Sequence, residues 1–138
     1  MFYRSPERRT SGIMLIHFIF IYPLFFLLIF IGIEVYWVLH VRHIMSVAAE
    51  EGTRAMAHSC VTSEEAVNVT QQYLLLAGLN ANFEISANEQ DPQDPQRASV
   101  EIHVPFKEVL ITGINIFADE TLSVKVAMYR SLSCDQLL

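Results

Sequence analysis

Residues 12–33 of the chain read GIMLIHFIFIYPLFFLLIFIGI, and this stretch decides the fold. Between Ile13 and Ile33 every residue except His17 is apolar, aromatic, glycine or proline. A helix of about 20 such residues is long enough to cross roughly 30 Å of hydrocarbon. A core helix in a domain this small would rarely be apolar on all faces. The stretch therefore predicts a membrane-spanning helix.

The sequence that follows argues against a cleaved secretion signal. Such a signal has an apolar core of about 7 to 15 residues, followed by a cleavage site of small residues. Here the apolar run is longer, and the chain continues from Glu34 as EVYWVLHVRH, with bulky aromatic residues and no such site. We therefore expect the helix to be retained as an anchor.

Residues on either side of the span indicate its orientation. Arg4, Arg8 and Arg9 precede it, and basic flanks tend to remain on the cytoplasmic side. Tyr36 and Trp37 follow it, and such amphipathic rings favour the membrane–water interface. We predict a cytoplasmic N-terminus and a C-terminal domain on the opposite side of the membrane.

The helical pattern continues beyond the span. The chain has no proline between Glu34 and His58, and small residues recur there at i, i+4, i+7 and i+11, which places them on one helical face. A face of small residues lets another helix or a sheet approach closely. These predicted packing residues are Ala48, Gly52, Ala55 and Ser59.

A second helix is predicted after Val61. Thr62 suits the N-cap position, with Glu65 placed to reach back to it, and Gly78 suits a left-handed helix end. Between these signals an apolar set recurs at helical spacing: Ala66, Val69, Tyr73, Leu76 and Ala77.

Beyond Gly78 the hydrophobic period changes to two. Three stretches alternate apolar and polar residues, which is the pattern of half-buried strands in an antiparallel sheet packed on helices. A polar loop with prolines, Asn88–Arg97, joins the first two, whereas Lys107–Phe117 fits either a short helix or a crossover that covers the sheet edge. The apolar positions are Phe83, Ile85 and Ala87, then Val100, Ile102, Val104 and Phe106, then Leu122, Val124, Val126 and Met128.

These elements predict an α+β fold. A long N-terminal transmembrane helix extends into a small domain with a second helix and a three-stranded antiparallel sheet, and the helices stabilise a sheet that would be marginal alone. We divide the chain into a basic leader (1–12), a transmembrane helix (13–37), a helix extension (38–60) and an α+β domain (61–138).

The sequence suggests no catalytic site. It contains no Gly-rich phosphate loop and no paired cysteine motif. His40 and His43 are i, i+3 neighbours, but a closed metal site needs four ligands, and solvated side chains are the simpler interpretation. We expect no enzymatic activity, no metal and no cofactor. The formal net charge of −6 argues against nucleic acid as a partner, because binding phosphates requires a basic patch.

The two cysteines, Cys60 and Cys134, lie at the two ends of the predicted outer region. In an oxidising compartment they could form a disulfide that joins the end of the chain to the start of that region. Two separate buried thiols are an equally simple interpretation.

The start of the span resembles that of a TadE-like pseudopilin. The family pattern is a basic leader, a glycine, four apolar residues, a Glu-Phe pair, a few apolar residues and a proline. The chain has the same order in G-IMLI-HF-IFIY-P, from Gly12 to Pro23. IGIEVYWVLHV also resembles the family's membrane exit, and Ser46–Ala57 resembles its Ala-rich helix.

This resemblance implies a non-enzymatic part of a tight-adherence (Flp-type) pilus or secretion system in a bacterial inner membrane. It implies that a prepilin peptidase cuts between Gly12 and Ile13, and that the mature helix packs among other pilin or pseudopilin subunits and inner-membrane assembly proteins. Independently of the resemblance, Pro23 leaves the Ile19 carbonyl without its helical partner, so we expect a bend or a packing contact with a partner there. The C-terminal domain would then be periplasmic, and the subunit could enter a surface pilus.

One residue departs from the family pattern. His17 stands where such proteins carry a glutamate, and an imidazole cannot supply the anion that pairs with a neighbour's amine. We therefore expect an accessory minor pseudopilin and not a major, self-polymerising pilin. The alternative is a generic single-pass protein whose periplasmic module binds a ligand or partner, in which case Gly12 and His17 have no special role.

Overall fold

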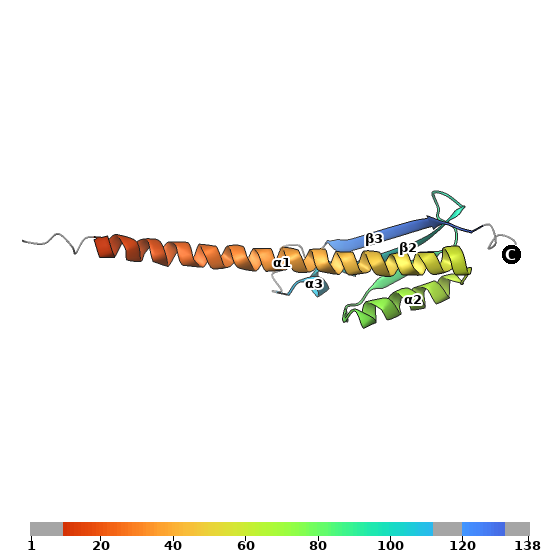
Figure 1. Cartoon of the computed structure of the whole chain (residues 1–138), viewed down its shortest axis with the longest axis horizontal. Coiled ribbons are helices and arrows are strands. Elements are labelled where there is room, and N and C mark those ends of the chain that lie inside the picture. The colour runs from red at the N-terminus through yellow and green to blue at the C-terminus, as the bar shows by residue number, and fades with distance from the viewer. Residues whose placement is uncertain (1–9, 112–119, 132–138) are drawn as a thin grey trace, which may run out of the picture. The chain divides into compact units, whose positions relative to one another are not determined.

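The computed structural model describes residues 10–111 and 120–131 (Figure 1). It divides the chain after Tyr36 into two compact units. α1 contributes to both units, which we describe separately. In chain order the elements are α1 (Thr10–Ser59), α2 (Ser63–Leu76), β1 (Glu84–Asn88), β2 (Arg97–Pro105), α3 (Phe106–Val109) and β3 (Thr121–Tyr129). This is the predicted α+β arrangement.

The first unit consists of the N-terminal part of α1. The helix continues through Pro23, and its described apolar side chains are exposed. The described residues contain one helix long and apolar enough to cross a membrane. That helix is compatible with the predicted single-pass anchor.

The second unit contains the sheet, in the order β1-β2-β3 with both pairs antiparallel. Ile102 on the central strand lies opposite Ile85 on one side and Val124 on the other. The predicted alternation places one apolar face inward, and four β2 residues on that face are fully buried: Ala98, Val100, Ile102 and Val104.

Two predicted strand ends differ in the structure. β1 begins at Glu84, one residue after Phe83, and β2 ends at Pro105, so Phe106 is the first residue of α3 and not the last of the strand. Pro105 caps α3 in an extended conformation, and it cannot donate a ladder hydrogen bond. The short-helix interpretation of Lys107–Phe117 is correct for its beginning, and residues 112–117 lie outside the described part.

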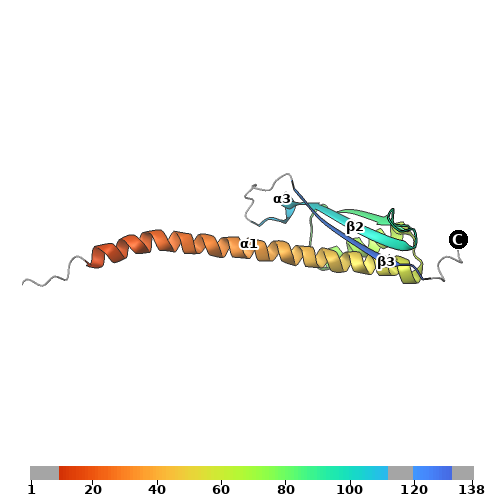
Figure 2. The same cartoon turned by 90° about the horizontal axis from the view of Figure 1, so that it is seen from above.

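The C-terminal part of α1 packs with the strands of the second unit (Figure 2). Its buried face supplies the helix side of the core: Val41, Met45, Ala48, Ala49 and Met56. Thr53 is also buried, and its hydroxyl donates to the carbonyl of Ala49 at 2.6 Å and to that of Val126 in β3 at 3.3 Å. Further along, the Ser131 amide donates to the carbonyl of Ala57 at 2.9 Å.

α2 has the predicted ends. Thr62 is the N-cap, and its hydroxyl and the Glu65 carboxylate exchange hydrogen bonds with each other's backbone amides. After the helix, Gly78 has φ +80°, and the Leu79 amide donates to the carbonyl of Leu74 at 3.1 Å. The reciprocal cap and the left-handed glycine explain why α2 begins and ends at these residues.

The face that α2 buries differs from the predicted apolar set. Ala66 is buried as predicted, and Thr70 and Leu74 are buried with it. The other predicted residues are exposed: Val69, Tyr73, Leu76 and Ala77. The reason is the close approach of Gly52 in α1, where a Cβ atom would lie 2.1 Å from Thr70 Oγ1 and 3.2 Å from the Ala66 carbonyl oxygen. Only small side chains fit between two helices this close. The buried Thr70 hydroxyl keeps a hydrogen-bond partner, because it donates to the Ala66 carbonyl at 2.8 Å.

The substitution Gly52→Ala is expected to destabilise the second unit. Overpacking a tight contact lowers the free energy of unfolding by about 1–3 kcal/mol. The better helix propensity of alanine offsets up to about 1 kcal/mol of this loss. We expect a lower unfolding midpoint in circular dichroism of the full chain in detergent.

Two variants test the cause of that loss. Gly32→Ala is the matched control, because a Cβ atom there meets nothing within 4 Å. In a Thr70→Ala background, Gly52→Ala should cost clearly less, since the two positions are in contact and their effects are not additive. An equal cost in both backgrounds would contradict the proposed clash.

Candidate functional site

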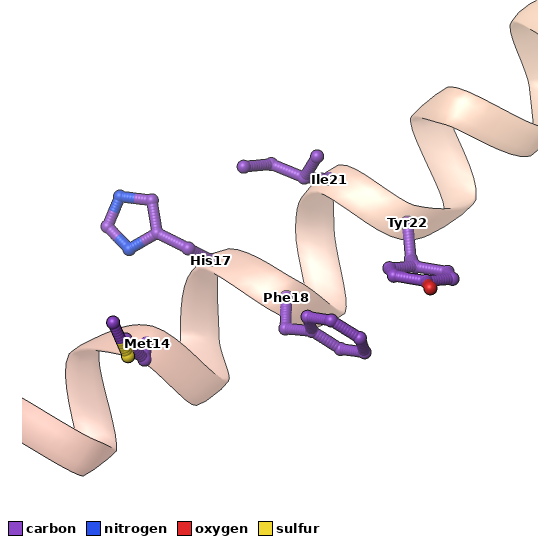
Figure 3. A pocket seen from close by; sticks show the side chains of 5 residues that line it. All are labelled: Met14, His17, Phe18, Ile21 and Tyr22. Carbon is purple, nitrogen blue, oxygen red and sulfur yellow. The ribbon is translucent and has the colours of Figure 1, made fainter.

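The candidate site lies in the first unit, on one face of α1. Met14, His17, Phe18, Ile21 and Tyr22 line a shallow depression there (Figure 3). We call these five residues the N-terminal stripe. They recur at i, i+3, i+4, i+7 and i+8, and such positions lie on one side of a helix.

Aromatic contacts extend this face along the helix. The ring centroids of Phe18 and Tyr22 are 4.3 Å apart, and those of Tyr22 and Phe26 are 5.8 Å apart, with tilted planes in both pairs. Within one helix, aromatic rings four residues apart lie on the same face and contribute modestly to its stability. Of the five residues of the N-terminal stripe, only His17 was a predicted site residue, and the regular spacing of the other four is the signal that would have found them.

The predicted cleavage site lies at the start of the same helix. Gly12 is exposed, and the bond to Ile13 falls in the first turn of α1, which begins at Thr10. The first four amides of a helix have no intrahelical partner, so this turn opens at lower cost than the helix interior. Pro23 lies eleven residues beyond Gly12, within α1.

The predicted packing residues belong to the second unit. Ala48 and Gly52 are buried, Ala55 is half-buried and Ser59 is exposed. The close contact described for Gly52 brings α1 against Thr70, Ala66 and Val100. This face is therefore occupied by the chain's own α2 and sheet.

The remaining histidines form no described metal centre. His40 and His43 are both exposed, and His40 contacts the ring of Trp37 at a centroid distance of 5.8 Å. His103 lies 3.1 Å from a Glu101 oxygen on the sheet. Within residues 10–111 and 120–131 no group of three or more histidine, cysteine or acidic residues is arranged to hold a metal ion.

A polar cluster on the β1–β2 connection was not anticipated. The connection repeats Asp-Pro-Gln at residues 91–93 and 94–96, and in each copy the aspartate accepts a hydrogen bond from the glutamine amide two residues on, at 2.9 and 3.1 Å. Such Asx-type turns are a known use of aspartate. The repeated tripeptide is the sequence signal for this structure.

The first aspartate of that repeat joins the connection to β3. Asp91 is buried, with 4% of its side chain exposed, and its carboxylate lies 2.8 Å from the Lys125 ammonium. The hydrogen bond from Lys125, together with that from the Gln93 amide, holds the pKa of Asp91 below its ordinary value of 3.8. The guanidinium of Arg97 stacks over the Tyr129 ring 4.2 Å from its centroid and also donates to its hydroxyl.

Substituting Lys125 by methionine should destabilise the second unit at neutral pH. A carboxylate whose pKa is depressed in the folded state stabilises the fold above its unfolded pKa of about 4, and this contribution is lost as the pH falls through the folded-state value. Wild type and Lys125→Met should therefore differ in unfolding midpoint at pH 7, and the difference should narrow as the pH is lowered from 4 to 3.

Lys107→Met is the matched control for this experiment, because Lys107 is exposed on α3. It should shift the midpoint little at either pH. A difference between wild type and Lys125→Met that is unchanged at pH 3 would show that the lysine acts through its packing and not through Asp91.

The predicted disulfide falls partly outside the described residues, because Cys134 is beyond residue 131. Cys60 follows α1 with φ 54°. Ser131 and Ala57 are joined by a hydrogen bond. Ser131 lies three residues before Cys134, and Ala57 lies three residues before Cys60. Three residues span at most about 10 Å, so the contact supports the pairing, which stays a prediction.

Intact-mass analysis under non-reducing conditions tests this pairing. We expect the chain exported to an oxidising compartment to be two hydrogens lighter than its reduced form, and to resist alkylation until reductant is added. Two alkylated thiols without reductant would exclude the bond.

An apolar N-terminal helix joined to a helix-and-sheet unit is compatible with a single-pass membrane-anchored α+β protein. Residues 12–54 match the family model described as TadE-like protein. The chain is therefore TadE-like over these residues, as the sequence predicted, and the match supports a function related to the Tad pilus. The matched segment begins at Gly12 and includes His17, Pro23 and Gly52. No curated protein and no solved structure matches the chain.

Proposed function

We propose that the chain is a minor pseudopilin-like structural or assembly component of a tight-adherence (Flp-type IV) pilus or secretion system. The observation that carries the proposal is the TadE-like match over residues 12–54, which coincides with the apolar helix and begins at the glycine where cleavage is expected. The chain acts by binding other subunits and assembly proteins and has no enzymatic role.

The arrangement of α1 supports this role. Its first unit exposes apolar side chains on all sides, as a helix surrounded by lipid or by other transmembrane helices requires. Its second unit buries the small-residue face within the chain's own fold. Contacts of α1 with other subunits are therefore available mainly along the span.

The proposal includes a location and an orientation. The span anchors the chain in a bacterial inner membrane, with the basic leader in the cytoplasm and the second unit in the periplasm. Arg4, Arg8 and Arg9 before the span favour this orientation.

Processing at Gly12 is the most direct test. Beside an active prepilin peptidase, the chain should lose the residues up to Gly12 and carry Ile13 as its new N-terminus, as measured by intact mass and N-terminal sequencing. Gly12→Leu should block this cleavage, whereas Gly32→Leu, the matched control at the other end of the span, should not. An uncut wild-type chain beside the active peptidase would remove the processing step from the proposal.

Pilus assembly tests the role itself. Deleting the gene should reduce surface pili, and the wild-type chain should restore them. If pili are unaffected, the chain is better described as a generic membrane-anchored binding module. Gene neighbourhood gives independent support if a secretion ATPase and a prepilin peptidase lie alongside.

A further inference from the structure

We infer that one end of the second unit docks on the lipid surface of the membrane, through exposed aliphatic side chains at the end of the unit where α3 lies. The inference rests on the proposed function for its membrane setting, and it goes beyond that function by giving the second unit a partner of its own. Its basis is the direction of the sheet along α1, the exposure of the side chains at that end and the distribution of charge.

The sheet runs along the C-terminal part of α1, so one of its ends points back toward Trp37. The Thr53 hydroxyl lies 3.3 Å from the Val126 carbonyl oxygen, and the Ser131 amide donates to Ala57. These contacts place the last residues of β3 beside the end of α1. The other end of the sheet, where α3 lies, is therefore directed toward the start of the second unit (Figure 2).

This end of the sheet lies close to the expected membrane surface. Thr121 begins β3 five residues before Val126, about 17 Å along a strand, and that length corresponds to about 11 residues of helix. Counted back from Thr53, it ends near Arg42. Trp37 closes the predicted span and is the first residue of the second unit. Arg42 therefore lies about 8 Å along the helix from the outer interface.

The same end carries the most exposed aliphatic residues of the second unit. Asn82 follows α2, and its backbone amide and side chain donate to the Glu108 carboxylate at 2.7 and 3.2 Å, which joins the chain after α2 to α3. Among the described residues of this unit, four large aliphatic residues are more than half exposed, and all four lie near this junction or near Trp37. We call them the apolar rim: Leu39, Leu75, Leu76 and Ile111.

The position of the apolar rim identifies lipid as its partner. A gathering of exposed apolar side chains marks an interaction surface, and such side chains lie more favourably at a membrane interface than in water. The rim belongs to the end of the unit that chain continuity holds at the membrane. A second copy is a poor alternative, because the second unit contains 13 acidic and 6 basic residues and two such units repel each other.

Charge contributes little to this docking. At the rim end the cations of Arg42 and Lys107 are balanced by the carboxylates of Glu108 and Glu120. Anionic headgroups attract segments with an excess of lysine and arginine, and this end has no such excess among its described residues. Burial of the apolar rim is therefore the main contribution, and docking should be insensitive to salt.

The test uses the full chain in phosphatidylcholine vesicles that carry a nitroxide quencher on the lipid headgroup. Trp37 is the single tryptophan of the chain, so Trp37→Phe removes the native signal and allows one reporter to be added. Thr121→Trp places the reporter at the rim end of β3. Tyr129→Trp is the matched control on the same strand and face, about 26 Å away. Both positions are exposed, and neither belongs to the apolar rim.

The headgroup quencher should reduce the fluorescence of the Thr121→Trp reporter strongly and that of Tyr129→Trp little. With the first reporter, Leu76→Ser together with Ile111→Ser should lower the ratio of docked to undocked units by about 5- to 30-fold, the range expected for partly burying two aliphatic side chains. Val69→Ser, two helical turns before Leu76 on α2, is the matched control and should leave the quenching unchanged. The comparison of reporters leaves the rim intact, so it is informative even if the serine variants fold poorly.

Three results would overturn the inference. The first is equal quenching of the two reporters, and the second is an effect of the rim substitutions no larger than that of Val69→Ser. The third is quenching that requires anionic lipid and disappears in high salt, which would assign the contact to Arg42 and Lys107. Quenching that appears only when the protein is diluted in the bilayer would also contradict it, because another copy would then cover the rim.

Two further measurements separate this inference from the proposed function. Native Trp37 should be quenched in the unchanged chain, and its absence of quenching would overturn the membrane setting and the docking together. Intact pili after gene deletion, with Thr121→Trp still quenched, would remove the proposed function alone and support the docking.

Discussion

The second unit depends on one steric constraint, the absence of a side chain at Gly52. This residue lets α2 approach α1 until the Thr70 hydroxyl oxygen lies 2.1 Å from where a Cβ atom would be, with the Ala66 carbonyl and a Val100 methyl close by. One position thus joins two helices and the central strand of the sheet. The hydrogen bond from Thr70 to Ala66 makes this approach compatible with burial, because a buried hydroxyl without a partner would be costly.

The two parts of α1 differ in which side chains are apolar and which are buried. The first unit is apolar around its whole circumference and exposed, so its sequence is set by the hydrocarbon that would surround it. In the second unit only one face is buried, and that face uses small residues beside larger ones such as Met45 and Met56. The TadE-like match, over residues 12–54, lies within α1 and includes residues of both parts.

Much of the fold followed from local signals in the sequence. The apolar run, the Thr62–Glu65 cap, the glycine at residue 78 and the alternation of the strands each depend on neighbouring residues, so a single chain shows them. The buried face of α2 was not accessible in this way. Val69, Tyr73 and Leu76 are the more apolar choice, but the close approach of α1 favours Ala66 and Thr70, and that preference is a tertiary effect.

The candidate site was accessible only in part for a similar reason. His17 stands out because a polar residue in an apolar run needs an explanation, whereas the other four residues of the N-terminal stripe are ordinary apolar or aromatic residues until they are placed on a helix. Asp91 was read as part of a polar loop, since its burial depends on Lys125, 34 positions away in the sequence. Distant partners of this kind are not visible in local composition.

The contact between Thr53 and β3 has a consequence for how copies of this chain can associate. Edge strands with free backbone groups recruit strands from other chains, and proteins commonly avoid this by covering the edge. The Thr53 hydroxyl, which donates to Ala49, also lies 3.3 Å from the Val126 carbonyl oxygen, and the Ser131 amide just beyond the strand donates to Ala57 near the end of α1. A strand added at β3 would have to displace these contacts, so extension of the sheet by another copy is disfavoured at that edge.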